Sequence, residues 1–478
     1  MRVLQAPRQR AGAHRAVVAA AAVVSVAAIA SASGARATEP IAWSTYGAGP
    51  TRSGYVDEDF PPRTVLRRVW STRLQGNLTS QLLVTDTAAG TTLYVGTNAG
   101  AVYAIGAGGR PRWRARFGSL RHSCAQLGQW GIVGTGAIDN ATHAAYFTDI
   151  FGRLHALDLV TQTELPGWPV ELYESYLKEV VWGAIAIVDG AAYIGTASYC
   201  DRPMEGKLIR VDLKTRAVSR WIAVPAELGG GGGIWGWGGV AYSPLRDSLL
   251  VVTGNAFRGG KNVGRNFRED AGYGEKLVEL SPRLDVRAAS HPANIRPTGD
   301  YDFVGSPVPF MRQGCGELVA ALNKNGWLYV WPADKIAAGP TSSVRVSKAT
   351  LRQPLLSQAA HSPRLNALFM VSFHRIFRVD INTSCRARVA WSRRLGAGLL
   401  NSSPTVSGDT VWFVRNADRS TLLGIDARTG AIRFRGSLRS PVFAAPTVFR
   451  GRIYVPTWDG DVTAFRFASV TPRWVSVS

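Results

Sequence analysis

The chain has 478 residues, of which 46% are hydrophobic and 18% are charged. This composition provides a large core and excludes a disordered polyelectrolyte. Lys and Arg number 55 against 33 Asp and Glu, but the basic residues are scattered along the chain. Scattered charge argues against nucleic acid binding and favours attraction to an anionic surface or polymer.

The N-terminus has the features of an export signal. Four arginines precede an Ala- and Val-rich run at residues 16–30, and an A-x-A cleavage site follows at 35–37. We therefore predict that residues 1–37 are a signal peptide and that the mature chain is secreted or periplasmic. The alternative is an uncleaved membrane anchor, for which the run is short. No later apolar run is long enough to span a membrane, so no span is expected after cleavage.

The mature part contains four cysteines, Cys124, Cys200, Cys315 and Cys385. In an exported protein an even number of cysteines favours disulfides, and three pairings are possible. There is no C-x-x-C-H motif for haem attachment, and the seven histidines lack the spacing of a zinc site.

One pattern recurs along the mature chain: a β-rich run, a turn of small or polar residues, and a second β-rich run. In chain order, eight copies begin at Leu93, Ala145, Ala191, Leu249, Glu317, Ala367, Val411 and Ile453. Each copy has the alternation and the Gly, Asn or Asp turn residues of a β-hairpin. A spacing of roughly forty to sixty residues leaves room for four strands in each unit.

These repeats predict an all-β fold, a single eight-bladed β-propeller of four-stranded blades over residues 38–478. Two smaller propellers or sandwiches are the alternative, but no Pro- or Ser-rich linker divides the chain. Long helices are not expected; short ones are suggested only at 174–178 and from Asn323 onward.

The repeat resembles that of the eight-bladed quinoprotein alcohol dehydrogenases. The segment WSTYGAGPTRSGYVDEDFPP, from Trp43, resembles the start of that propeller, and the V-G-T-x-x-G-x-V-Y-A-I pattern resembles its turns. The resemblance extends to about Phe467. Noncatalytic relatives, such as outer-membrane assembly scaffolds, share the same repeat. The D-Y-D-F-x-x-S-P and K-N-G-x-L-Y motifs most resemble the secreted members similar to polyvinyl alcohol dehydrogenase, which oxidise secondary alcohols and polymers.

The glycine-rich stretch GGGGGIWGWGGVAYSP, residues 229–244, carries the first site residues that this resemblance implies. A gap-free match implies that Trp237 lies beneath the ring of pyrroloquinoline quinone (PQQ). Trp235 is its neighbour, or the stacking residue if the register slips by two. The same match implies that Asn255 ligates Ca²⁺ through its amide oxygen. Ser243 departs from the family, which usually has Asp there. A flat cofactor needs an aromatic floor and glycines that let the backbone approach.

Further positions follow from the same resemblance. Asp201 stands near the place of a calcium-ligating Glu, with Glu205 as the alternative. Asp302 is the expected general base that takes the proton of the alcohol, with Asp300 as the alternative. Lys324 is expected to direct its ammonium group at the quinone oxygen.

The resemblance also has gaps. The family often has a disulfide between adjacent cysteines beside the cofactor, and in this chain Cys124 stands alone in the corresponding blade; we expect it to pair with Cys200. Each site residue also has a structural alternative: Trp237 filling a blade interface, Asn255 and Asp302 in turns, and Lys324 in a hairpin turn.

Two functions are compatible with these features. The first is an exported dehydrogenase that uses PQQ and Ca²⁺ to oxidise an alcohol, or a polymer-borne secondary alcohol, and passes the electrons to a separate acceptor. The second is a noncatalytic exported propeller that binds a protein or a polysaccharide. The missing cysteine pair and the imperfect carboxylate ligand favour the second, whereas the ordered set of Trp, Asn, Asp and Lys favours the first, which we adopt.

Overall fold

The computed structural model describes residues 41–60, 64–87, 90–122, 128–174, 178–198, 204–257, 267–268, 271–295, 301–348, 356–396 and 400–469. The chain from Glu39 to Ser478 forms one compact unit. The predicted signal peptide lies outside the described residues. Among the described residues, no helix is long and apolar enough to cross a membrane.

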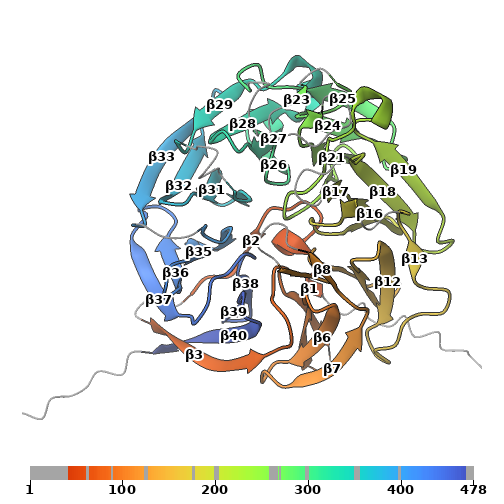
Figure 1. The fold of residues 1–478 in the computed structure, drawn as a ribbon. Helices are drawn as coiled ribbons and strands as arrows, with labels where there is room; N and C mark the ends of the chain where they lie inside the picture. Colours follow the sequence, from red (N-terminus) through yellow and green to blue (C-terminus); the bar gives the residue numbers. More distant parts are fainter. Residues whose placement is uncertain are drawn as a thin grey trace, which may run out of the picture. The chain divides into compact units, whose positions relative to one another are not determined.

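Within these ranges, eight sheets of at least four strands follow one another around a ring, as Figure 1 shows. The predicted all-β, eight-bladed propeller is therefore confirmed. The helices of the described residues are short 3₁₀ turns, η1 (Tyr46–Ala48), η2 (Ala226–Leu228) and η3 (Ala333–Ala338).

Each blade runs from an inner strand near the axis of the ring to an outer strand. In chain order, the first four blades are β1 (Ile41–Trp43), β4 (Leu83–Thr87), β5 (Gly90–Gly96), β6 (Ala101–Gly106) and β7 (Pro111–Arg116); β10 (Ala137–Asp139), β11 (Ala144–Thr148), β12 (Arg153–Asp158) and β13 (Val170–Glu171); β15 (Ala186–Val188), β16 (Ala191–Gly195), β18 (Lys207–Asp212) and β19 (Val218–Ile222); and β20 (Ala241–Ser243), β21 (Ser248–Val252), β24 (Leu277–Leu280) and β25 (Val286–Ser290).

The last four blades are β26 (Val308–Arg312), β27 (Gly316–Leu322), β28 (Trp327–Pro332) and β29 (Ser342–Arg345); β30 (Ala360–Ser362), β31 (Ala367–Val371), β32 (Arg375–Ile381) and β33 (Ala387–Arg394); β2 (Tyr55–Val56), β34 (Thr405–Ser407), β35 (Thr410–Arg415), β36 (Thr421–Asp426) and β37 (Ile432–Ser437); and β38 (Thr447–Phe449), β39 (Arg452–Pro456), β40 (Asp461–Ser469) and β3 (Thr64–Arg73). Further two-stranded sheets lie outside the blades, formed by β8 (Leu120–His122) with β9 (Gly128–Trp130), β14 (Glu179–Val180) with β17 (Ala197–Ser198), and β22 (Ala256–Phe257) with β23 (Phe267–Arg268).

The ring is closed by a strand from the beginning of the chain. β3 pairs antiparallel with β40, from Thr64 opposite Ser469 to Arg73 opposite Asp461. The last blade therefore takes its outermost strand from the N-terminal part and its other strands from the C-terminal part. Because strands from both ends of the chain pair in one blade, the ring of blades has no open end.

The repeated hairpins form the central strands of the blades. Each of the eight predicted hairpins is present, as in β27 with β28 and β39 with β40. The short helix suggested from Asn323 onward is wrong: Asn323 to Gly326 form the turn between β27 and β28. The Asn323 side chain accepts a hydrogen bond from the Asn325 amide at 2.9 Å, which stabilises this turn. The other suggestion, at 174–178, includes residues outside the described ranges.

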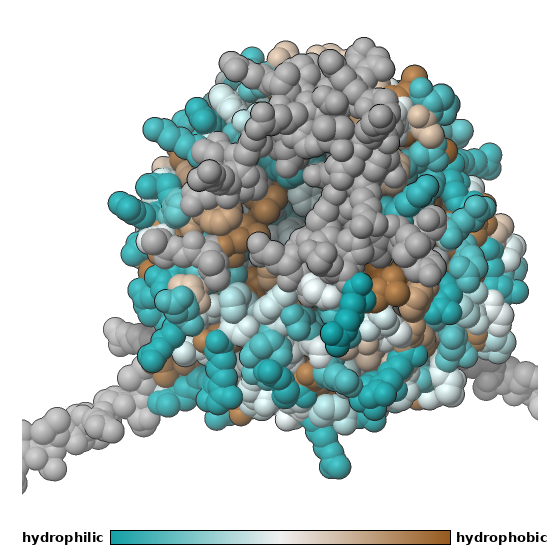
Figure 2. Space-filling model, in the orientation of Figure 1, coloured by the Kyte–Doolittle hydropathy of each residue, from teal (hydrophilic) through white to brown (hydrophobic). Residues whose placement is uncertain are grey.

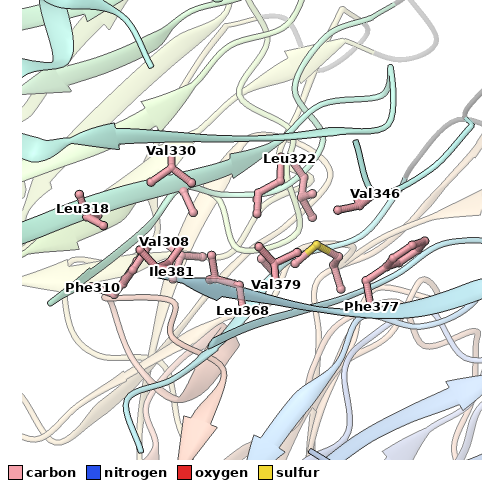
Figure 3. Close-up of a cluster of buried hydrophobic side chains, with 14 of the residues drawn as sticks. Val308, Phe310, Leu318, Leu322, Val330, Val346, Leu368, Phe377, Val379 and Ile381 are labelled. Carbon is pink, nitrogen blue, oxygen red and sulfur yellow. The ribbon is translucent and has the colours of Figure 1, made fainter. Parts of the chain in front are cut away.

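The core lies between the faces of neighbouring blades. Figure 3 shows one such cluster, in which side chains of β26 to β28 pack against side chains of β31 and β32. The apolar members, including Val308, Leu322 and Val379, are fully or almost fully buried. Because each blade packs on the next, burial around the ring fixes the position of the loops that face its axis.

Cys315 and Cys385 form a disulfide across the same two blades, closing a loop of 70 residues. The sequence alone allows three pairings of the four cysteines. The described residues contain the bond between Cys315 and Cys385. The expected bond between Cys124 and Cys200 lies outside the described residues.

Candidate functional site

A cavity of about 270 Å³ lies on the axis of the ring. Its lining comes from several parts of the ring, among them Ala197 in β17, Trp237 before β20 and Phe443 before β38. A volume of this size lies just below the usual range of about 300–1,000 Å³ for small-molecule pockets. Figure 2 shows the surface in the orientation of Figure 1, with a hollow near the middle of that face and hydrophobic residues on part of its wall.

The cavity brings together the predicted site residues that the structure describes. It is lined by residues from well-separated segments of the sequence: Trp235, Trp237, Asn255, Asp302 and Lys324. Their convergence supports the proximity expected from the resemblance. The chemical roles of these residues stay predictions.

Asp302 occupies the most polar part of the cavity. Its Oδ2 accepts a hydrogen bond from the indole Nε1 of Trp235 at 2.8 Å. Its Oδ1 forms an ion pair with Nζ of Lys324. Asp302 is 7% exposed, so this carboxylate is largely removed from water and its orientation is constrained by these two neighbours.

The turn between β27 and β28 places Lys324 beside Asp302. The amide of Lys324 donates to the carbonyl oxygen of Asp302 at 3.1 Å, and Asn323 donates from its side chain to the carbonyl oxygen of Tyr301. The ammonium of Lys324 also lies 4.9 Å from the centre of the Trp235 ring. A cation at that distance over an indole is attracted by the ring quadrupole. Trp235, Asp302 and Lys324 therefore form one connected cluster.

Trp237 lies in a different, aromatic part of the cavity. Its ring centre is 6.5 Å from that of Trp182 and 6.2 Å from that of Phe443. Tyr46, Ala184 and Ala445 pack against it from the buried interior. The indole thus has packed neighbours and also lines the cavity, as expected of an aromatic floor. Trp235, in contrast, is engaged with Asp302 and Lys324.

Two glycines allow the backbone to approach closely at this cavity. A Cβ on Gly231, whose φ is +106°, would lie 2.3 Å from the carbonyl oxygen of Asn255. A Cβ on Gly254 would lie 3.1 Å from Oδ2 of Asp302. Gly231 and Gly254 are therefore required for the close packing of neighbouring loops at the cavity.

The described residues provide only part of the ligand set that a calcium ion needs. Asn255 is 5% exposed and lines the cavity with Asp302, but Ca²⁺ takes six to eight oxygens. The described residues contain no cluster of three or more His, Cys, Asp or Glu side chains suited to a metal. Asp201 lies outside the described residues, as does Asp300, the alternative base. Glu205 lines a separate cavity and accepts a hydrogen bond from the amide of Ala226 at 2.9 Å.

Several lining residues are not recognisable from the sequence. Trp182, Met204, Leu356, Leu400 and Phe443 contribute apolar surface. Each lies in a loop before or between strands, where an apolar residue looks like an ordinary core residue. Only the position of its segment at the axis of the ring distinguishes it, and the sequence does not reveal that position.

Comparisons with known proteins agree with the fold. Residues 375–478 match the family described as outer membrane protein assembly factor BamB. No curated protein matches the sequence. Among solved structures, the quinohemoprotein alcohol dehydrogenase from Comamonas testosteroni is similar with a TM-score of 0.71 and 16% identity, over 91% of this chain and 81% of that chain.

A europium-containing methanol dehydrogenase is similar with a TM-score of 0.66 and 16% identity, over 90% of this chain and 98% of that chain. BamB from Moraxella catarrhalis has a TM-score of 0.55 and 16% identity, over 84% of this chain and 100% of that chain. At these identities the likeness establishes the propeller fold alone. Because dehydrogenases and an assembly factor share that fold, function has to be argued from the cavity.

Proposed function

We propose that the protein is an exported PQQ-dependent dehydrogenase that oxidises an alcohol. The observation that supports this most strongly is the convergence of Trp235, Trp237, Asn255, Asp302 and Lys324 on one axial cavity. The residue types suit a planar, anionic quinone: aromatic surface, a cation and a buried carboxylate. The similar propellers include a quinohemoprotein alcohol dehydrogenase and a methanol dehydrogenase, which favours the same chemistry.

In this proposal Asp302 removes the hydroxyl proton of the substrate. Its carboxylate is held by Trp235 and Lys324, so the accepting oxygen has a defined direction. The ammonium of Lys324, which lies next to the same carboxylate, stabilises the negative charge that develops during the reaction. Trp237 supplies the flat apolar surface, with Trp182 and Phe443 beside it. The apolar lining limits water around the reacting atoms.

The described residues fit PQQ through the aromatic floor, the close backbone at Gly254 and the cation of Lys324. When bound, PQQ supplies the two-electron acceptor chemistry. Calcium is proposed with it, held by Asn255 and by Asp201. The electrons then leave to a separate acceptor. A polymer-borne secondary alcohol is the proposed substrate, on the resemblance to the polyvinyl-alcohol-dehydrogenase-like members.

A reconstitution experiment tests this proposal. PQQ and Ca²⁺ are added to the purified mature protein, binding is followed by quenching of tryptophan fluorescence, and alcohol-dependent reduction of a dye is measured. We expect saturable quenching and dye reduction that needs both the quinone and an alcohol. Absence of both would contradict the dehydrogenase proposal.

A noncatalytic propeller is the second candidate. The match of residues 375–478 to the BamB family favours it. The ion pair between Lys324 and Asp302 is also compatible with a structural role for both residues. In that case PQQ does not bind and no alcohol is oxidised. The substitution Asp302→Asn then changes only the stability of the fold.

A further inference from the structure

A segment near the beginning of the chain lies across the ring and contacts several of its blades. This strap, residues 44–56, accepts backbone hydrogen bonds from several inner strands: Ser44 from Ile138, Pro50 from Tyr242, Ser53 from His361 and Gly54 from Val406. In Figure 1 the orange-red N-terminal segment occupies the middle of the ring. The strap therefore forms part of the packing around the axis.

The strap carries a fully buried cation. Arg52 is 0% exposed. Its guanidinium donates to the carbonyl oxygens of Val240 at 2.9 Å, Ile185 at 3.1 Å and Tyr46 at 3.1 Å. It also donates to the hydroxyl of Thr45 at 2.9 Å. These acceptors are all uncharged, and no carboxylate contacts Arg52 within the described residues.

A buried cation without a carboxylate partner is unusual, because its removal from water is costly and neutral acceptors offset that cost only in part. Burial lowers the pKa of Arg52 to about 9, so the group still carries its charge at neutral pH. Lys324 differs, since its charge is compensated by the carboxylate of Asp302. Among the described residues around the cavity, Arg52 is thus a positive charge that no carboxylate compensates.

Arg52 lies directly behind the aromatic floor. Its guanidinium is 3.5 Å from the carbonyl oxygen of Ala184, whose amide donates to the carbonyl oxygen of Trp237 at 3.0 Å. A Cβ on Gly238, the residue after Trp237, would lie 3.3 Å from Cδ of Arg52. The neighbouring strap residue Tyr46 packs against Trp237 itself.

We propose that Arg52 makes the axial cavity selective for an anionic planar ligand, by holding an uncompensated positive charge behind Trp237. This inference rests on the proposed function, since it concerns the same cavity. Arg52 does not touch the ligand and acts through its field and through the support of Trp237. A buried charge is screened by salt much less than a surface charge.

The size of the effect follows from Coulomb's law. At a separation of ~10 Å and an effective dielectric constant of about 20, one unit charge alters the affinity for another by roughly tenfold. The charge of Arg52 therefore makes a ligand with several carboxylates bind more tightly than its neutral ester, by roughly tenfold or more.

The test compares two ligands of nearly the same shape, PQQ and its uncharged trimethyl ester. The ratio of their dissociation constants is measured by tryptophan quenching in the wild-type protein, in Arg52→Gln, in Arg52→Lys and in the double variant Asp302→Asn/Lys324→Gln. We expect Arg52→Gln to lower the preference for PQQ roughly tenfold, and Arg52→Lys to retain most of it. Because the ratio cancels damage that affects both ligands, a merely structural role does not change it.

The double variant Asp302→Asn/Lys324→Gln keeps the inference testable if Arg52→Gln does not fold, because it removes both charges of the ion pair and leaves the net charge of the cavity unchanged. We expect this variant to retain a preference for PQQ of roughly tenfold, owing to Arg52. Equal affinity of this double variant for PQQ and the ester would overturn the inference, as would an equal loss of both affinities in Arg52→Gln. Failure of PQQ to bind the wild-type protein is a different result, which overturns the proposed function and this inference with it.

Discussion

Two tryptophans in different parts of the ring have different surroundings. Trp412 on β35 is 0% exposed and is enclosed by Phe60, Phe434 and Phe467. Trp237 lies in a glycine-rich loop before β20, and part of its surface lines the cavity. A tryptophan on a regular blade strand is therefore used for packing. A tryptophan in an axial loop is available for a ligand.

Two aspartates show the same contrast. Asp149, in the turn between β11 and β12, accepts from Arg153 at 2.8 Å and interacts with His155 at 3.2 Å. Burial raises the pKa of Asp149, but the hydrogen bonds from His155 and Arg153 outweigh burial and leave the pKa below its usual value. Its contacts hold a hairpin together, whereas Asp302 lines a cavity.

The largest expected effect is on catalysis by Asp302. Asp302→Asn removes the proposed base while nearly preserving its shape. We expect alcohol-dependent dye reduction to fall roughly 10³-fold or more. Because the substitution removes the carboxylate that pairs with Lys324, the melting temperature falls, while the affinity for anionic PQQ is retained or increased. Asp149→Asn is the matched control, with lowered thermal stability and nearly normal turnover per folded molecule. Loss of turnover in Asp149→Asn alone would reverse the comparison.

The second prediction separates the two tryptophans. Trp237→Ala removes the proposed aromatic floor, and we expect PQQ affinity to fall by roughly 10- to 100-fold, since stacking of a flat ring on an aromatic side chain is worth about 1–3 kcal/mol. Trp412→Ala is expected to lower the free energy of unfolding by about 4 kcal/mol, with PQQ affinity retained. Fluorescence titration and chemical denaturation measure the two effects. Equal effects of both substitutions on affinity would show that Trp237 also acts only through packing.

Removal of the disulfide tests whether the stability of the fold can be lowered without a change in ligand binding at the cavity. Replacing Cys315 and Cys385 by serine opens a loop of 70 residues, and the chain-entropy relation gives a loss of about 4 kcal/mol in unfolding free energy. PQQ affinity is expected to remain unchanged, because neither cysteine lines the cavity. Denaturation of the double variant beside the wild type under reducing conditions provides the control, since the two should then agree.

The smallest effect concerns buried His361. Burial lowers its pKa to about 4, below the ordinary value near 6.5, so between these values the unfolded chain binds a proton that the folded chain does not. The stabilising contribution is therefore complete above pH 6.5 and is lost as pH falls towards 4, by up to about 3 kcal/mol. His361→Leu should flatten this part of the pH–stability curve. Exposed His374→Leu is the control and should leave the curve unchanged.

The fold could be predicted almost completely because the same hairpin pattern occurs eight times. Strand alternation and turn residues are local properties, and they are correct for every repeated hairpin. The cavity residues Trp237, Asn255, Asp302 and Lys324 could be proposed only through a resemblance. Arg52 could not be proposed at all, because its burial depends on blades that follow it by more than one hundred residues.

Contacts between distant segments explain what the sequence leaves open. The cysteine pairing depends on which blades are neighbours in the ring, and the sequence allows three answers. The turn at Asn323 is mispredicted as a short helix because residues 321–324 are compatible both with a helix and with a strand followed by a turn. Pairing with β28 decides the outcome, since it satisfies the backbone groups of β27 in a sheet.

The pairing of β3 with β40 has a consequence for how the protein is made. Residues 64–73 leave the ribosome early, yet their partner is not available until residues 461–469 have been synthesised. The nascent chain can therefore form individual hairpins but cannot complete its ring before synthesis is nearly finished. A chain that remains open for so long is compatible with passage through a narrow channel as an unfolded thread, with closure on the far side.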